Sequence, residues 1–311
     1  MMPQDPAPTR RSILASIAAT AGALALRPVA GRAQSRPPIK KSIPSTGEEL
    51  PAVGLGTWIT FNVGNDRELQ EECAAVMGAF FESGGRMIDS SPMYGSSQPT
   101  IGYGLRRLGL PQALFSAEKV WISNPAAGPE QIERSRAHWD VPRFDLVQVH
   151  NLVSWERHLP ALLAMKAEGK LRYVGITTSE GRRHAEVERI MASRPIDFVQ
   201  VTYNVLDRDV EARILPLARH RGIAVIVNRP FREGHLIRQI ERHPLPQWAA
   251  ETGASNWAQF ILKFIVSHPA VTCAIPATTR VDHVRENMAA AAGIVPDESL
   301  RRRMADYVRQ L

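Results

Sequence analysis

The chain has 311 residues, of which 44% are apolar and 22% are charged, and its formal net charge is +7. This composition suits a globular protein with a large core, either one barrel or two ordinary domains, and argues against a disordered or fibrous chain. Residues 1–33 carry four arginines against one aspartate, so the rest of the chain carries only +4. No basic stripe interleaved with aromatic residues is present, which argues against nucleic acid as a partner.

The first 33 residues have the pattern of an export signal. Arg10 and Arg11 precede an uncharged run, residues 13–26, that is too short to span a bilayer core of ~30 Å as a helix. The run is rich in Ala, Ser, Thr and Gly rather than Leu, and this weak hydrophobicity beside paired arginines resembles a twin-arginine signal, with a cut near Ala33. This interpretation predicts passage of the folded protein through the twin-arginine export machinery into the periplasm, without a stable membrane anchor. The alternative is a disordered basic tail.

Residues 43–49 place a Ser-Thr-Gly turn between apolar ends, which predicts a small β-hairpin. From residue 52 onward, short apolar runs alternate with stretches of helical spacing. The predicted strands are 52–57, 86–89, 114–118, 144–149, 171–176, 197–201, 222–227 and 271–275. The predicted helices are 67–83, 97–108, 129–138, 156–168, 183–192, 209–220, 254–267 and 280–291, with one more near 297–310.

This alternation predicts an α/β fold, a (β/α)8 TIM barrel preceded by the β-hairpin, because buried parallel strands need not alternate polar and apolar residues. No linker or low-complexity tract interrupts residues 34–311, so we expect them to form one barrel domain. The active site of such a barrel lies at the C-terminal ends of its strands. Polar residues stand at these ends, namely Gly56, Thr57 and Trp58, then Asp89, Lys119, His150, Thr177, Thr178, Gln200, Asn228, Arg229, Pro276, Ala277 and Thr278.

Asp89, Tyr94, Lys119 and His150 follow three successive strands and suit protonation of a carbonyl oxygen while hydride reaches the carbon. A phenol with a pKa of ~10 is a slow acid near neutrality, and we expect the Lys119 ammonium to lower the pKa of Tyr94. Asp89 would keep Lys119 charged and oriented, and His150 would donate a hydrogen bond to the substrate oxygen. One His and one Asp are too few for a catalytic metal site, so no metal is expected.

Two other classes of protein remain open at this stage. The barrel could bind a nucleotide without catalysing a reaction, because a fold alone does not establish activity. Alternatively, Lys119 could act as a Schiff-base nucleophile in an aldolase-like enzyme. The two cysteines, Cys73 and Cys273, lie 200 positions apart without metal-ligand spacing, which predicts two free thiols in either case.

Several segments, in order along the chain, resemble the signatures of the aldo/keto reductase superfamily. They are Val53-Gly54-Leu55-Gly56-Thr57-Trp58, Ile88-Asp89-Ser90-Ser91-Pro92-Met93-Tyr94-Gly95, Glu118-Lys119-Val120-Trp121, Val149-His150-Asn151, Gln200-Val201-Thr202-Tyr203-Asn204, and Ile275-Pro276-Ala277-Thr278 through Glu286-Asn287. The likeness covers about residues 43 to 293. It implies a barrel that reduces an aldehyde, ketone or quinone with NADP(H), held at the top rim without a Rossmann domain, and agrees with the lack of a complete G-x-G-x-x-G motif.

The resemblance also implies roles for individual residues. Tyr94 would be the proton donor, Lys119 and Asp89 would tune it, and His150 would position the carbonyl. Gln200 would hold the nicotinamide carboxamide. The remaining cofactor contacts would come from the rim residues Gly56, Thr57, Trp58, Thr177, Thr178 and Asn228, from Arg229, Pro230 and Phe231 beside the pyrophosphate, and from Pro276, Ala277, Thr278, Arg280, Glu286 and Asn287 toward the adenosine.

Four positions depart from the common pattern of the superfamily. Thr177-Thr178 replaces a Ser-Asn pair, Asn228 replaces an aromatic residue, Ala277-Thr278 replaces Lys-Ser, and His283 replaces an arginine. Arg280 is then the candidate cation for the 2′-phosphate, because a guanidinium pairs well with phosphate, and NADP(H) is expected over NAD(H). An apolar mouth for the substrate is expected from Trp58, Met93, Trp121, Trp155 and Phe231.

Overall fold

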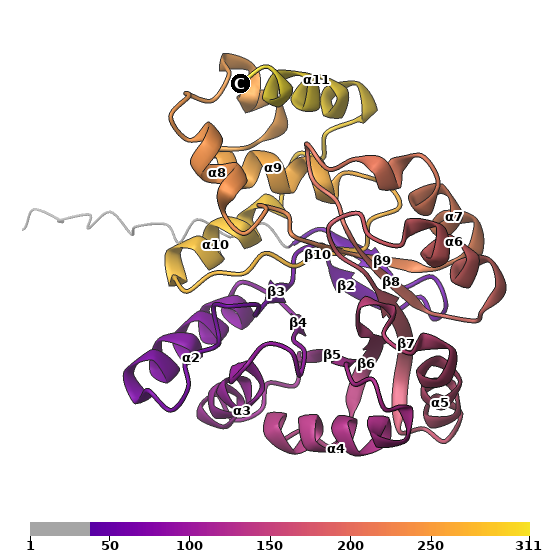
Figure 1. The fold of residues 1–311 in the computed structure, drawn as a ribbon. Helices are drawn as coiled ribbons and strands as arrows, with labels where there is room; N and C mark the ends of the chain where they lie inside the picture. The colour runs from indigo at the N-terminus through magenta and orange to yellow at the C-terminus, as the bar shows by residue number, and fades with distance from the viewer. Residues whose placement is uncertain (1–37) are drawn as a thin grey trace, which may run out of the picture. The chain divides into compact units, whose positions relative to one another are not determined.

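Eight parallel strands form the centre of the computed structural model, which describes residues 38–311 (Figure 1). The predicted signal at residues 1–33 lies outside the described residues. The strands pair in sequence order, and the bridges Val53–Ala274 and Gly56–Ala277 join the first strand region to the last, so the predicted barrel is confirmed. The strands are β3 (Leu55–Gly56), β4 (Met87–Asp89), β5 (Phe115–Val120), β6 (Phe144–Val149), β7 (Leu171–Thr177), β8 (Phe198–Thr202), β9 (Ala224–Asn228) and β10 (Cys273–Ala274).

Helices alternate with these strands and cover their outer surface (Figure 1). Apolar residues that point outward from the strands, such as Val147, Val174 and Val199, pack with the helices in one large core. Within residues 38–311, no helix is both long and apolar enough to cross a membrane. The α-helices are α2 (Arg67–Glu82), α3 (Ser97–Arg107), α4 (Gly128–Trp139), α5 (Trp155–Ala167), α6 (His184–Ser193), α7 (Ile214–Arg221), α8 (His235–Ile240), α9 (Trp257–Val266), α10 (Val281–Ala290) and α11 (Glu298–Arg309).

The predicted hairpin consists of β1 (Lys40–Ser42) and β2 (Glu49–Pro51), which pair antiparallel. Its apolar residues Ile43 and Leu50 are fully buried and belong to the cluster that fills the barrel interior. The carboxylate of Glu48 accepts hydrogen bonds from Arg86, from Arg172 and from the hydroxyl of Tyr173, which lies on β7. The hairpin therefore closes one end of the barrel and leaves the other end for the site.

Side chains that point into the barrel change from apolar to polar along the strands. Successive residues of a strand point to opposite faces, so every second residue faces the interior. Leu146 of β6 and Phe198 of β8 belong to the apolar interior cluster, and two residues later the strands carry Gln148 and Gln200. Gly175 makes room at this level, because a Cβ there would lie 2.8 Å from the Phe198 carbonyl oxygen and 3.1 Å from Cγ of Gln148.

The helices differ from the sequence prediction in two places. The predicted helix 209–220 is divided into a 3-10 turn, Asp209–Glu211, and α7, because Pro216 has no N–H and is tolerated only in the first turn of a helix. The second difference lies between β9 and α9, where α8 and the 3-10 helix Gln247–Thr252 were not predicted. A helix of six residues is too short to show a clear apolar period in the sequence.

Glu118 joins β5 to the two neighbouring helices. Its fully buried carboxylate accepts hydrogen bonds from Nε2 of Gln98 on α3 (2.9 Å) and from Nε1 of Trp139 on α4 (2.8 Å). Burial raises the pKa of Glu118 to about 7, although the positive charge of Lys119 and the hydrogen bond from Gln98 act in the opposite direction. The folded protein therefore holds a proton on Glu118 at pH values where the unfolded chain releases it.

This raised pKa predicts a pH dependence of stability. The favourable contribution of the Glu118 proton is complete below the ordinary value near 4.5 and is lost as the pH rises through about 7. Between pH 5 and 8.5, the free energy of unfolding of the wild type should fall relative to that of Glu118→Gln, which cannot titrate, by up to about 3 kcal/mol. Urea unfolding of both proteins across this range measures the difference. Parallel stability curves would contradict the prediction.

Candidate active site

A buried ion pair lies at the polar end of the barrel interior. Nζ of Lys119 is 2.5 Å from Oδ1 of Asp89 and 2.6 Å from the carbonyl oxygen of Ser90, and both charged side chains are almost completely buried. Asp89 is the last residue of β4, and Lys119 lies on the neighbouring strand β5. Successive side chains of a strand point to opposite faces, and at these two positions they point into the barrel. The parallel pairing of these two strands thus brings together an acid and an amine that are 30 residues apart.

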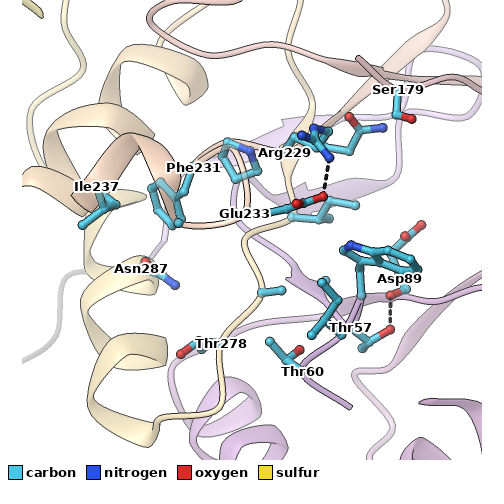
Figure 2. Close-up of a pocket in the computed structure, with 18 of the residues that line it drawn as sticks. Thr57, Thr60, Asp89, Ser179, Arg229, Phe231, Glu233, Ile237, Thr278 and Asn287 are labelled. Atoms are coloured by element: carbon cyan, nitrogen blue, oxygen red, sulfur yellow. Dashed lines mark hydrogen bonds and ion pairs between the residues drawn. The ribbon is translucent and has the colours of Figure 1, made fainter. Parts of the chain in front are cut away.

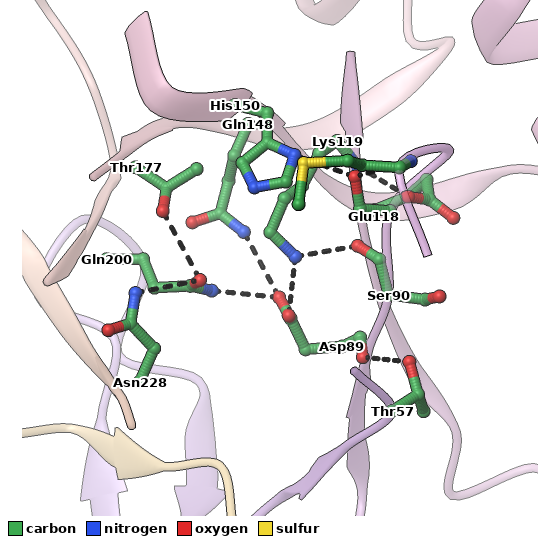
Figure 3. A network of polar contacts seen from close by, with 12 residues as sticks. Thr57, Asp89, Ser90, Glu118, Lys119, Gln148, His150, Thr177, Gln200 and Asn228 are labelled. Carbon is green, nitrogen blue, oxygen red and sulfur yellow. Dashed lines mark hydrogen bonds and ion pairs between the residues drawn. The ribbon is translucent and has the colours of Figure 1, made fainter. Parts of the chain in front are cut away.

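Two amide side chains hold the second oxygen of Asp89 (Figure 3). Nε2 of Gln200 is 2.9 Å from Oδ2 and Nε2 of Gln148 is 3.3 Å from it. The hydroxyl of Thr57 donates to the backbone carbonyl of Asp89 at 2.8 Å. The carboxylate is therefore held from three directions, by Lys119, Gln148 and Gln200.

Tyr94 lies in the loop after β4, next to the ion pair. Its ring makes edge contacts with Trp58, at a centroid distance of 4.9 Å, and with His150, at 5.8 Å. Nζ of Lys119 is 5.1 Å from the centroid of the Tyr94 ring. Burial raises the pKa of Tyr94 to about 12, and the positive charge of Lys119 offsets this only in part. Lys119 acts to lower the pKa of Tyr94, as expected, but burial outweighs this charge, so the pKa lies above its ordinary value and not below it.

His150 completes the group and is neutral. Burial, together with the positive charge of Lys119, lowers the pKa of His150 to about 2. Its Nδ1 atom is 2.7 Å from the hydroxyl oxygen of Ser91, which leaves Nε2 for a molecule in the adjoining cavity. A neutral imidazole has one N–H and one lone pair, so the partner of Nδ1 decides whether Nε2 donates.

The contacts of Lys119 do not suit a Schiff-base nucleophile. Burial acts to lower the pKa of Lys119, but the negative charge of Asp89 and the charges of its other neighbours outweigh burial and raise the pKa. A nucleophilic lysine needs a lowered pKa and access to the substrate. Lys119 is fully buried and does not line the cavity, so it is not placed to attack a substrate as the aldolase-like alternative requires.

A cavity of about 740 Å³ opens beside Tyr94 and His150 (Figure 2). In Figure 2, Thr57 and Asp89 lie on one side of it, and Phe231 and Ile237 lie on the other. Most residues predicted from the sequence line this cavity, namely Gly56, Thr57, Trp58, Asp89, Tyr94, His150, Thr177, Gln200, Asn228, Arg229, Pro230, Phe231, Ala277, Thr278, Glu286 and Asn287. Lys119, Thr178, Pro276 and Arg280 do not line it.

The cavity lining is divided by charge. Apart from Asp89, the lining residues from the loops after β3 and β4 are uncharged, and they include Trp58, Ile59 and Met93. Charged side chains line the part formed by the loops after β7 and β9 and by helices α8 and α10. They are Glu180, Arg182, Arg229, Glu233, Arg238, Glu241 and Glu286. The uncharged part thus includes Tyr94, and the charged part is formed by other loops and helices.

The structure separates the predicted cationic residues. Arg229 lines the cavity and pairs with Glu180, at 3.1 Å, and with Glu233. Arg280 precedes α10, is exposed, and pairs with Asp282 through two of its nitrogen atoms. His283 and Arg238, by contrast, line the cavity.

Two of the aromatic residues predicted at the mouth lie elsewhere. Trp155 is 7% exposed, and its Nε1 donates to Glu186, so it belongs to the core. Trp121 is exposed, with its ring centroid 6.5 Å from that of His150, but it does not line the cavity.

Cys73 and Cys273 are buried free thiols. Within residues 38–311, no group of three or more His, Cys, Asp or Glu side chains is arranged to hold a metal ion.

Sequence reasoning did not find some residues that shape the site. Gln148 was missed because it lies inside β6, before the strand end at which His150 follows, although its side chain faces the barrel interior. Ser91 lies in the motif that contains Asp89 and Tyr94, and its contact with His150 could not be seen in the sequence. Glu180, Glu233 and the residues of α8 gave no signal, because their position depends on how two separate loops meet.

Comparison with known proteins identifies the family. Residues 52–303 match the Aldo/keto reductase family. Methylglyoxal reductase YeaE of Escherichia coli (strain K12) is 27% identical over 259 residues, which cover 80% of this chain and 89% of that protein. A crystal structure of the thermostable aldo-keto reductase Tm1743 with the inhibitor epalrestat has a TM-score of 0.72 and 28% identity, and the match covers 86% of this chain and 99% of that one.

A second structural neighbour supports the fold alone. An aldo/keto reductase from Klebsiella pneumoniae in complex with NADP and acetate has a TM-score of 0.72 at 23% identity, with 84% of this chain and 93% of that chain covered. The family match spans residues 52–303, which include every strand of the barrel. The chain therefore belongs to the aldo/keto reductase family and is an NAD(P)H-dependent oxidoreductase.

Proposed function

We propose that this protein reduces the carbonyl group of a small aldehyde, ketone or quinone, with Tyr94 as the proton donor. The observation that carries this proposal is the position of Tyr94 between His150 and the Lys119–Asp89 pair, with all but Lys119 lining the cavity. Two relatives from Escherichia coli (strain K12) are named as methylglyoxal reductases, at 27% and 25% identity, which supports a carbonyl substrate.

The four residues have separate tasks in this proposal. A bound nicotinamide nucleotide supplies a hydride to the carbonyl carbon. Tyr94, whose raised pKa keeps it protonated near neutral pH, gives its proton to the oxygen. The charge of Lys119, held by Asp89, stabilises the phenolate that remains, and neutral His150 offers a hydrogen bond to the oxygen from Nε2. A barrel that only binds a nucleotide would not need this combination.

Tyr94→Phe should remove carbonyl reduction and leave cofactor binding almost unchanged, because the substitution deletes only the hydroxyl group. General acid catalysis contributes typically 10² to 10⁴-fold, so kcat should fall at least about 100-fold. Steady-state kinetics with methylglyoxal and a fluorescence titration with NADPH measure the two quantities. Tyr103→Phe is the matched control, since Tyr103 pairs with Glu71 outside the cavity. Near wild-type turnover by Tyr94→Phe would exclude it as the acid.

The proposed cofactor is NADP(H), in preference to NAD(H). Structural neighbours from Klebsiella pneumoniae contain NADP or NADPH, whereas one relative is named an NADH-specific methylglyoxal reductase. Donors for phosphate oxygens line the charged part of the cavity, where they lie among four glutamates: Arg182, Arg229, Arg238, His283 and Asn287. Arg280 lies two residues beyond Thr278, which lines the cavity, and we assign it the 2′-phosphate, for which it would have to leave Asp282.

Arg280→Ala should therefore weaken binding of NADPH more than binding of NADH. A hydrogen bond to a charged group contributes roughly 1.5–3 kcal/mol, and competition from Asp282 reduces this, so a loss of about tenfold is expected for NADPH alone. Titration of both nucleotides by protein fluorescence measures the difference. Arg285→Ala on α10 is the control, because Arg285 is exposed and outside the cavity lining. Equal losses for the two nucleotides would refute the role of Arg280, and Arg238 and His283 would be tested next.

The proposal also includes export. Residues 1–33 are assigned as a twin-arginine signal peptide and residues 34–311 as the mature barrel domain, with cleavage near Ala33 and a periplasmic location. Support comes from the paired arginines before a weakly hydrophobic run in the sequence. Export of a folded protein would allow the cofactor to be bound in the cytoplasm.

Replacing both Arg10 and Arg11 with Lys should retain the precursor in the cytoplasm with full enzymatic activity, because the pair acts as an address and keeps its charge. Cell fractionation with immunoblotting, followed by an activity measurement on the retained precursor, tests both parts. Normal delivery of the double variant to the periplasm would show that the arginine pair does not direct export.

A further inference from the structure

The turn that follows β3 contains a residue in an unfavourable backbone conformation. Ile59 has φ 66°, and the N–H of Thr60 donates to the carbonyl oxygen of Trp58 at 2.8 Å. This hydrogen bond across three residues defines a γ-turn with a positive φ at its centre, which is a rare and strained form. A β-branched residue with a positive φ is an outlier, and such strain is found where function requires it.

Packing in the core does not account for this conformation. Ile59 is 60% exposed, the largest exposed fraction among the large apolar residues that remain exposed in residues 38–311. The surrounding hydrogen bonds hold the turn, since Phe61 donates to the carbonyl of Thr57 and Asn62 donates to the carbonyl of Ile59. The hydroxyl of Thr60 is buried without a hydrogen-bond partner in the described structure. The turn thus costs stability in two ways, yet it presents an apolar side chain to solvent.

The turn directs the side chain of Ile59 toward the cavity. Ile59 lines the cavity together with Trp58 and Met93. Trp58 is 37% exposed and packs edge-on against Tyr94, the proposed acid. On the far side of His150, Trp121 is 40% exposed. The rings of Trp58, Tyr94, His150 and Trp121 therefore lie next to one another in this order, and Ile59 follows Trp58 in the chain.

We infer that Ile59 determines substrate specificity by contacting an apolar substituent on the carbonyl carbon. Exposed apolar side chains gathered at one place indicate a binding surface, and lining residues from this part of the cavity are uncharged apart from Asp89. The preferred substrates are therefore aldehydes and ketones with an aryl or branched alkyl group, rather than analogues with a methyl group. This inference rests on the proposed function, because it concerns the substrate of the same site.

Acetaldehyde and cyclohexanecarbaldehyde are the probes, since they share the reacting formyl group and differ only in the substituent on its carbon. The wild type should show a kcat/KM about tenfold or more higher for cyclohexanecarbaldehyde, which is the range that small changes in an apolar pocket produce. Ile59→Gly should lose most of this preference through a lower kcat/KM for cyclohexanecarbaldehyde alone. Ile59→Asn should do the same, because asparagine tolerates a positive φ and keeps the turn while replacing the apolar surface with a polar one.

Leu110→Gly is the matched control. Leu110 is also a large apolar residue with a positive φ, 48°, and is 42% exposed, but it lies after α3 and does not line the cavity. Both glycine variants should keep or increase their melting temperature, since glycine adopts a positive φ without strain. Only Ile59→Gly should change the ratio of the two kcat/KM values, and its NADPH affinity should equal that of the wild type.

The outcomes separate this inference from the proposed function. If the wild type reduces both compounds and neither Ile59 variant changes the ratio, the specificity role is overturned and carbonyl reduction stands. A lower melting temperature for Ile59→Gly, with equal losses for both substrates, would assign Ile59 a structural role instead. If the wild type reduces neither compound with NADPH or NADH, both the proposed function and the inference are overturned.

Discussion

The buried pair of Lys119 and Asp89 is the constraint on which the rest of the site depends. Two charges removed from water are costly unless they are paired and their other hydrogen-bonding positions are satisfied, and loss of one partner typically costs 3–5 kcal/mol. The carbonyl of Ser90 and the amides of Gln148 and Gln200 meet this need. The pair therefore accounts for the polar layer at one end of a barrel whose other end is filled with apolar side chains and closed by the hairpin.

The same burial sets the protonation states around the cavity. It raises the pKa of Tyr94 and lowers that of His150, so at neutral pH the site holds a protonated phenol and a neutral imidazole beside an ammonium. A positive charge next to the phenol favours the phenolate as the proton leaves, which is when the stabilisation is useful. The part of the cavity beside Tyr94 is uncharged apart from Asp89, which suits a carbonyl compound, whereas the part beyond it carries both arginines and glutamates.

Much of the fold could be predicted from the sequence, because eight apolar runs alternate with eight amphipathic stretches and each pattern is local. The two differences between the predicted and observed helices each have a physical reason. The helix predicted over 209–220 is interrupted because Pro216 cannot lie in a helix interior, and α8 is too short for its period to be recognised. Asp89, Lys119 and His150 could be placed together because the carboxyl ends of parallel strands meet at one rim, and the resemblance to a known family added their roles.

The sequence by itself determined the order of the strands, the identity of the residues at the rim and, through its motifs, the family. Tertiary structure decided which of these residues face the cavity and what charges surround them. Arg280 pairs with Asp282 while Arg238 lines the cavity, Trp155 lies in the core, and burial reverses the expected shift in the pKa of Tyr94. The physical reason is that secondary structure follows from neighbours in the chain, whereas desolvation and ion pairing depend on groups that only the folded barrel brings together.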